Sequence, residues 1–368
     1  MKRKIAVILS LAMLLGMLAA CSSNSAPEDD TAQPPEQSST EVSEPETTGN
    51  DSEEADAGEW SVAGMPENEM VAHVNHQTED ESAPVVYFTS DLSPEGLKKV
   101  YEALGRTLEG NVAVKLSTGE QGNENYLNPD LIKELVQSVD GTIVECNTAY
   151  DGARTSTAMH LQVAEDHGFT AIADVDIMDA DGEIELPIEG GTYLTEDIVG
   201  SHLSDYDSMM VLSHFKGHPM GGFGGSLKNI SIGVASRGGK SWIHSAGTAK
   251  EGMQAWPQNP FLCSMAEAAW AVDNHFGEQI TYVNVLNNLS VDCDCMAIAA
   301  APTMGDIGIM ASLDPVALDS ASIDMVYDAH DGHDLVERIE SLNGLLILEH
   351  GETMGIGSQN YRLVNLDA

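Results

Sequence analysis

Residues 111–146 read NVAVKLSTGEQGNENYLNPDLIKELVQSVDGTIVEC and contain the clearest structural pattern in the chain. An apolar run at 111–117 predicts a strand, residues 128–139 predict a helix, and TIVEC at 142–146 predicts a second strand. The helix is expected to begin at Asn-Pro-Asp, because a capping side chain followed by proline is typical of helix N-termini. This stretch therefore predicts a strand–helix–strand unit.

The same alternation continues on both sides of this unit. Further strands are expected at 84–89, 170–174, 208–213, 280–285 and 307–312, and further helices at 94–108, 156–167, 261–276, 315–327 and 334–341. Strands that alternate with helices predict an α/β fold, in which helices flank one or more mostly parallel sheets. Residues 83–368 are numerous enough for one large domain or two closely joined subdomains.

The N-terminus has the features of an exported lipoprotein. Three basic residues at 2–4 precede an apolar run at 5–20, which has the length of a secretory signal. The run leads into Leu-Ala-Ala-Cys at 18–21, which resembles the lipobox of bacterial lipoproteins. An uncleaved membrane-spanning helix is the alternative, because the apolar run is near the lower length limit for spanning. We expect residues 1–20 to be a signal peptide and Cys21 to carry lipid, which would place the protein at the extracytoplasmic face of the cell membrane.

Residues 21–82 are expected to form an acidic tether between the lipid and a folded domain at 83–368. No Lys or Arg occurs between Lys4 and Lys98, and a segment so poor in apolar residues cannot bury enough surface to order its backbone. The whole chain has 59 acidic and 16 basic residues, for a net charge of −43. This charge excludes nucleic acid as a partner, because nucleic-acid binding needs a basic surface. Membrane lipid on Cys21 and a small anionic molecule remain as expected partners.

A second informative stretch, HFKGHPMGGFGGSLKNISIGVASRGGKSWIH, occupies residues 214–244 and predicts a binding loop. It directly follows the strand expected at 208–213, and ligand loops of α/β folds gather at the carboxyl ends of strands. Its glycines allow sharp turns or a close approach to a ligand. Imidazoles can bind metals or move protons, and a lysine can neutralise an anion or form a covalent adduct. A solvated loop with incidental charges is the alternative.

These residue types give two candidate sets. The candidate catalytic residues are His218, Lys228 and His244. The candidate ligand- or cofactor-binding residues are Lys216, Gly221, Gly222, Gly224, Gly225 and Asn229. A phosphate-binding P-loop is excluded, because the residue where its first glycine should precede Lys240 is Val234.

Asp-Cys-Asp-Cys at 292–295 is a candidate metal or redox segment. On an extended backbone, the side chains of Cys293 and Cys295 would point to the same side. They could share one soft metal ion or form a disulfide, and a pair of buried, inert thiols is the alternative. The candidate metal ligands are these two cysteines with His214 and His244, and the candidate ions are iron, nickel and zinc. The sequence has no Cys-x-x-Cys pair, so it encodes no ferredoxin-type 4Fe–4S cluster.

Several long strings resemble the family called domain of unknown function 362, whose members are often described as uncharacterised Fe–S centre proteins. They are VYFTSDLSPEGL at 86–97, NVAVKLSTGE at 111–120, GTIVECNTAY at 141–150, GFTAIADVDIMD at 168–179, LSHFKGHPMGGFGGSLKNISIG at 212–233, SVDCDC at 290–295 and DIGIMASLDPVALDSAS at 306–322. The family name implies an iron–sulfur cluster. Many members carry a Cys-x-x-Cys insertion just after the stretch that matches His244, and this chain lacks that insertion.

A shorter pattern is similar to the signature of nickel-pincer lactate racemases. It consists of His218, Lys228 and His244, with Gly-Gly-Phe-Gly-Gly between the first two. The resemblance implies that His218 moves a proton at the substrate, that Lys228 bonds to the cofactor and that His244 binds nickel.

Three functional hypotheses follow from these patterns, and they leave open whether the protein is an enzyme. The first is a membrane-anchored metal, redox or cofactor-binding protein of unknown reaction. The second is a racemase-like or oxidoreductase enzyme that acts on a small organic acid with a lysine-anchored cofactor. The third is a lipoprotein that binds an anionic ligand without catalysis, through the backbone N–H groups of the glycine-rich stretch.

Overall fold

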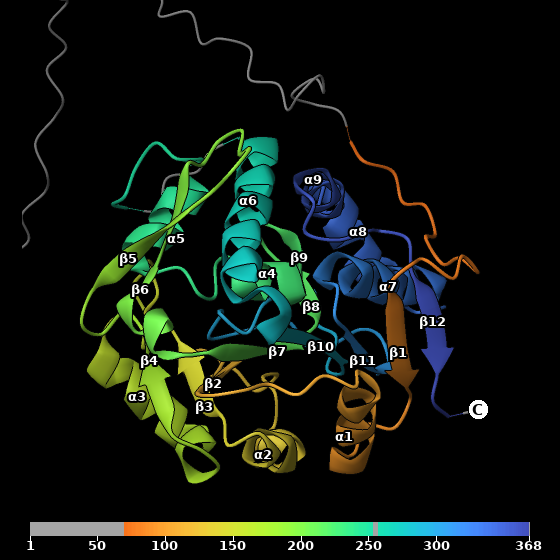
Figure 1. Ribbon diagram of the computed structural model, residues 1–368, viewed down its shortest axis with the longest axis horizontal. Coiled ribbons are helices and arrows are strands. Elements are labelled where there is room, and N and C mark those ends of the chain that lie inside the picture. The colour runs from red at the N-terminus through yellow and green to blue at the C-terminus, as the bar shows by residue number, and fades with distance from the viewer. Residues whose placement is uncertain (1–69, 253–256, 368) are drawn as a thin grey trace, which may run out of the picture. The chain divides into compact units, whose positions relative to one another are not determined.

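An eight-stranded sheet forms the centre of the protein, with helices on both faces (Figure 1). The computed structural model describes residues 70–252 and 257–367, which belong to one compact unit. The expected signal peptide, Cys21 and most of the expected tether lie outside the described residues. None of the described helices has both the length and the hydrophobicity needed to cross a membrane.

The sheet is mostly parallel, which confirms the predicted fold class. Its strands, in spatial order, are β12 (Arg362–Asn365), β1 (Val85–Thr89), β11 (Gly308–Ser312), β10 (Ile280–Leu286), β7 (Ser208–His214), β2 (Val112–Lys115), β3 (Thr142–Glu145) and β4 (Val175–Ile177). Only β11 runs antiparallel to its neighbours in this sheet. β7 and β10 are buried along their whole length, because helices cover both of their faces.

Helices α1 (Pro94–Ala103) and α2 (Pro129–Ser138) cover one face of the sheet, and α4, α6 and α7 cover the other (Figure 1). The remaining bounds are α3 (Thr157–Asp166), α4 (Ser226–Ile230), α5 (Arg237–His244), α6 (Gln258–Phe276), α7 (Pro315–Asp328), α8 (His333–Ser341) and α9 (Leu346–Met354). The predicted cap of α2 is confirmed, because the side chain of Asn128 accepts the N–H of Asp130. Two separate apolar cores lie on the two sides of the sheet.

The structure corrects the prediction for residues 170–174. They were expected to form a strand, but the chain makes a short 3₁₀ turn at Phe169–Ala171 and enters β4 only at Val175. Gly168 has φ of 87°, which turns the chain at the end of α3 and buries Phe169 in the core. The apolar pattern of this segment therefore reflects a buried turn.

The predicted loop at 214–244 is also more regular than expected. It contains the hairpin strands β8 (Lys216–His218) and β9 (Gly222–Gly224), followed by α4 and α5. A second hairpin, formed by β5 (Glu183–Pro187) and β6 (Glu196–Gly200), was not predicted.

The folded domain begins earlier than the expected boundary at residue 83. The N–H of Thr78 donates to the carbonyl of Tyr361, at 2.9 Å. His73 lies 2.7 Å from a carboxylate oxygen of Asp324 in α7. Residues 70–82 are therefore attached to the domain, although their composition predicts a tether.

Candidate functional site

A cavity of about 290 Å³ lies at the carboxyl ends of β2 and β3. Its wall contains four basic side chains, although the chain as a whole is strongly acidic: Lys115, Arg154, Lys228 and Lys240. The three candidate catalytic residues, His218, Lys228 and His244, all line this cavity, as does Asn229. The structure thus brings together residues that lie on β8, α4 and α5.

Lys228 is positioned by a buried carboxylate that holds the start of α4. One carboxylate oxygen of Asp319 in α7 accepts the N–H of Ser226 at 2.8 Å, and the other accepts the N–H of Leu227 at 3.0 Å. A Cβ atom on Gly225 would lie 2.3 Å from Asp319 Oδ1. Gly225 is therefore needed for the close approach of Asp319.

The other glycines of this stretch also serve internal packing. A Cβ on Gly222, whose φ is +81°, would lie 2.9 Å from the Cα of Gly344, and the N–H of Gly221 donates to His218 Nδ1. The residues that line the cavity include none of Gly221, Gly222, Gly224 and Gly225. Gly222 and Gly225 therefore serve close packing of the backbone, and the contact of these four glycines with a ligand stays a prediction.

The two cavity histidines have opposite hydrogen-bonding arrangements. His218 Nδ1 accepts the N–H groups of Met220 at 3.2 Å and Gly221 at 2.8 Å, so the neutral ring carries its proton on Nε2. His244 Nδ1 lies 2.6 Å from the carbonyl oxygen of Lys240, so it carries the proton and Nε2 keeps a lone pair. Burial lowers the pKa of both rings, that of His244 to about 4. At neutral pH, His218 offers a proton and His244 offers a lone pair.

Cys293 and Cys295 lie beside these residues, as the metal hypothesis requires. His218, Cys293 and Cys295 each offer one ligand atom, and the three atoms lie within 4.8 Å of one another. Lys228 Nζ is 3.8 Å from Cys293 Sγ. A hydrogen bond from the Cys295 side chain, with the Lys228 ammonium and His218, holds the pKa of Cys293 well below its usual range. The same coupling raises the pKa of Cys295, so the proton of the pair resides on Cys295.

Thiolates and imidazoles are suitable ligands for zinc, nickel and iron, so the donor set fits a soft or borderline metal. The two sulfurs fit this role better than His218. Two backbone N–H groups donate to Nδ1 of His218, so its proton lies on Nε2 and neither ring nitrogen has a free lone pair for a metal. His218 can bind a metal only by losing that proton or by giving up those two hydrogen bonds. The cysteine pair is therefore the core of the candidate metal site, and His218 is placed as a proton donor next to it.

The structure also corrects two other candidates, His214 and Lys216. His214 lies between Asp294, at 2.9 Å from Nδ1, and the carbonyl of Asn287, at 2.7 Å from Nε2. Both ring nitrogens of His214 already have oxygen partners, and the ring does not line the cavity, so His214 is not placed to bind a metal there. Lys216 Nζ donates to the same Asp294 carboxylate at 2.7 Å and does not line the cavity. These two residues hold the Asp-Cys-Asp-Cys segment in place.

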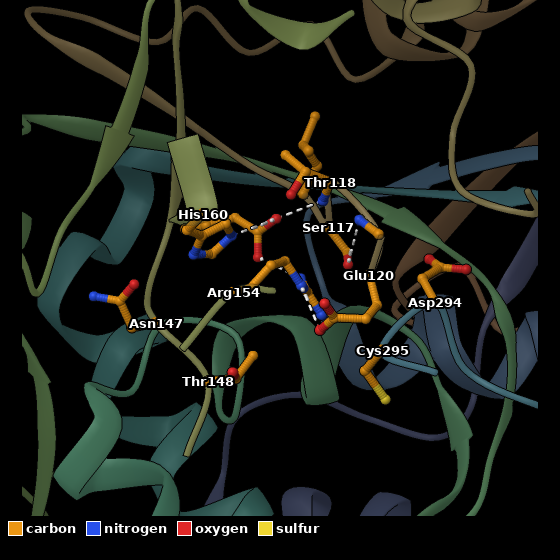
Figure 2. Close-up of polar contacts among 12 residues, drawn as sticks. Ser117, Thr118, Glu120, Asn147, Thr148, Arg154, His160, Asp294 and Cys295 are labelled. Atoms are coloured by element: carbon orange, nitrogen blue, oxygen red, sulfur yellow. Dashed lines mark hydrogen bonds and ion pairs between the residues drawn. The ribbon is translucent and has the colours of Figure 1, made fainter. Parts of the chain in front are cut away.

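Arg154 also lines the cavity and makes several hydrogen bonds there. It was not among the site residues predicted from the sequence. It donates to Glu120 at 3.4 Å, as Figure 2 shows, to Glu145 at 3.2 Å and to the hydroxyl oxygen of Tyr150 at 3.0 Å. The Tyr150 hydroxyl donates to the carbonyl of Cys295 at 3.0 Å. This network ties the segment after β3 to the cysteine pair.

Lys115, Glu145 and Lys240 were missed as well. Lys115 and Glu145 are the last residues of β2 and β3, which are adjacent parallel strands. Charged residues that end two neighbouring buried strands are a signal that could have identified them from the sequence. Lys240 had no such signal, because its place in the wall depends on how α5 packs.

The comparisons with known proteins identify the family. No curated protein matches the chain. The lactate racemase apoprotein from Thermoanaerobacterium thermosaccharolyticum is similar at 15% identity, over 56% of this chain and 52% of that one, with a TM-score of 0.36. A protein of known structure from Thermotoga maritima is similar at 13% identity, over 71% and 58%, with a TM-score of 0.37. The chain thus spans between half and two thirds of the length of these structures. The family described as "Domain of unknown function (DUF362)" matches residues 112–324, more than half of the chain, and the protein therefore belongs to the DUF362 family.

Proposed function

We propose that this protein holds a metal ion, or a metal-bearing cofactor, through Cys293 and Cys295 beside a cavity that receives a small molecule. One observation carries the proposal: the sulfur atoms of Cys293 and Cys295 lie within 4.8 Å of each other and of a ring nitrogen of His218, next to a basic cavity. A metal held by thiolates would supply a Lewis acid or a redox centre at this wall.

The surrounding residues are suited to such a centre. Metal-binding histidines usually donate their second ring N–H to a carbonyl or carboxylate, and His244 makes this bond to the carbonyl of Lys240. Its Nε2 is therefore a further candidate ligand, as the sequence predicts. His218 and Lys228 are placed to donate a proton and to stabilise negative charge in the same cavity.

Metal analysis tests this proposal. Protein purified without oxygen from its native host should contain iron, nickel or zinc in stoichiometric amount. The double variant Cys293→Ser, Cys295→Ser should lose the metal. Cys263→Ser is the matched control, because Cys263 is a buried thiol in α6 that does not line the cavity. Equal metal content in the double variant and the control, or metal-free native protein, would overturn the proposal.

A second candidate function, a racemase-like or oxidoreductase enzyme of small organic acids, is favoured by a different observation. His218 presents a proton donor and His244 presents a lone pair to the cavity that Lys228 also lines. An enzyme with a lysine-anchored cofactor would carry an adduct on Lys228. Intact-mass and peptide analysis of native-host protein should then show added mass that Lys228→Arg abolishes. An unmodified Lys228 contradicts this function while leaving the metal proposal intact.

We further propose that the domain lies outside the cytoplasm, anchored by lipid on Cys21. The support is the sequence pattern of residues 1–21. The wild-type protein should be found in the membrane fraction of its host and incorporate labelled fatty acid, and Cys21→Ser should do neither. A Cys21→Ser protein that remains labelled and membrane-bound would show that the anchor is different.

A further inference from the structure

Two of the four cations in the cavity wall, Lys115 and Lys240, form no ion pair with any carboxylate in the part of the chain that the structure describes. Lys115 and Lys240 are 1% and 7% exposed. Lys115 Nζ donates to the Leu116 carbonyl at 2.6 Å and to Asn229 Oδ1 at 3.0 Å, and Lys240 Nζ donates to the Ala235 carbonyl at 2.5 Å. Within residues 70–252 and 257–367, no carboxylate oxygen lies within 4.0 Å of either ammonium nitrogen.

The other two cations of the wall are already compensated. Arg154 faces Glu120 and Glu145, and Lys228 faces the Cys293 sulfur. A buried ammonium without a counter-ion is costly. Burial lowers the pKa of Lys240, and it lowers the pKa of Lys115 to about 8. Both lysines line the cavity, which is where an anion could reach them.

Lys115 is held in a fixed direction by its neighbours. The amide of Asn229 donates to the Lys115 carbonyl at 3.2 Å and to Ser213 Oγ at 3.0 Å, which leaves Asn229 Oδ1 directed at the ammonium. A Cβ on Gly233 would lie 2.8 Å from Lys115 Nζ, so the lysine needs a glycine beside it. An ammonium has three N–H donors. Among the described residues, one N–H of the Lys115 ammonium and two N–H groups of the Lys240 ammonium have no hydrogen-bond acceptor, and we call these three the open donors.

We infer that Lys115 and Lys240 form a subsite that binds the carboxylate of a small organic acid in this cavity. The three open donors suit the two oxygens of a carboxylate. Arg154 is paired with Glu120 and Glu145, and Lys228 lies 3.8 Å from the Cys293 sulfur, so Lys115 and Lys240 are the wall cations that can receive an anionic ligand. Apolar side chains such as Met220, Ile232 and Met296 line the same cavity and would contact the carbon skeleton. The subsite assigns residues to the organic-acid ligand of the second candidate function, and it rests on the proposed metal site only in sharing the cavity.

Calorimetric titration of full-length, metal-free protein with propionate, succinate and inorganic phosphate tests this subsite. Propionate should bind, and Lys115→Gln and Lys240→Gln should each weaken its binding by at least about tenfold, since each removes a charge-assisted hydrogen bond. Lys250→Gln is the control, because Lys250 is an exposed lysine that pairs with Glu185. Phosphate binding that is tighter than propionate binding would overturn the carboxylate assignment.

A measurement on the wild-type chain avoids dependence on the folding of the variants. Propionate should protect Lys115 and Lys240 from a lysine-acylating reagent, as read by peptide mass spectrometry, and should not protect Lys250. No detectable propionate binding, or equal affinity in all variants, would overturn the inference. The Cys293→Ser, Cys295→Ser protein should still bind propionate, so failure of the metal proposal and failure of this one give different results.

Discussion

The ammonium nitrogen of Lys228 lies 3.8 Å from the sulfur of Cys293, a residue 65 positions away in the chain. This contact joins two hypotheses that are separate in the sequence, one built on the histidines and lysine of residues 214–244 and one on the Asp-Cys-Asp-Cys segment. Because both sets of residues meet at one cavity, the proposed metal binding and the proposed acid–base chemistry concern a single site.

Neutralising Lys228 should raise the pKa of Cys293. In Lys228→Gln, Cys293 loses the positive charge that lies 3.8 Å from its sulfur, and an opposite charge at this range favours the ionised thiol. The ultraviolet absorbance of the thiolate, followed against pH in metal-free protein, measures the change. Lys250→Gln should titrate like the wild type, and an unchanged curve for Lys228→Gln would show that the ammonium does not stabilise the thiolate.

The two cavity histidines should be in opposite tautomeric states at neutral pH. Nitrogen NMR of isotope-labelled, metal-free protein should place the proton on Nε2 of His218 and on Nδ1 of His244, because their partners are backbone donors and a backbone acceptor, respectively. His330, which is 95% exposed, provides an internal reference without such partners. Identical tautomers for His218 and His244 would contradict the division of their roles.

Gly225→Ala should destabilise the fold far more than Gly224→Ala. The new methyl group at 225 would lie 2.3 Å from Asp319 Oδ1, whereas at 224 it would lie 3.8 Å from the side chains of Lys216 and Lys228. Overpacking of this kind costs roughly 1–3 kcal/mol of unfolding free energy. Urea denaturation of both variants gives the comparison. If both variants are equally stable but lose ligand binding, the glycines contact a ligand after all.

Asp197 should make the stability of the protein depend on pH. Its carboxyl is fully buried, and burial raises its pKa to about 8. Because the folded pKa lies above the unfolded value, the contribution to stability is full below about pH 4 and is lost as pH rises through about 8. Asp197→Asn should therefore be more stable than the wild type by roughly 2–5 kcal/mol at alkaline pH, with little difference near pH 4. Denaturant unfolding at both pH values measures this, and a difference that is independent of pH would contradict it.

The α/β class and most of the central strands could be predicted because their pattern is local. The central strands β7, β10 and β11 are short, mostly apolar runs, and helices such as α1 and α2 repeat their buried apolar residues with helical spacing. The prediction was wrong at residues 170–174, where the same apolar composition forms a turn around the buried Phe169. Composition cannot distinguish a strand from a buried turn when the run is short.

The sequence pattern alone also pointed to His218, Lys228, His244, Cys293 and Cys295, because reactive side chains were concentrated in two short segments. The roles of their neighbours depended on contacts between distant parts of the chain. His214 and Lys216 could be recognised as structural only when Asp294 was placed between them. Lys115 and Lys240 became candidates only when packing buried them without counter-ions. Local composition reports which chemical groups are present, whereas burial and partner choice are properties of the packed chain, and these govern whether a charged group is a support or a binding site.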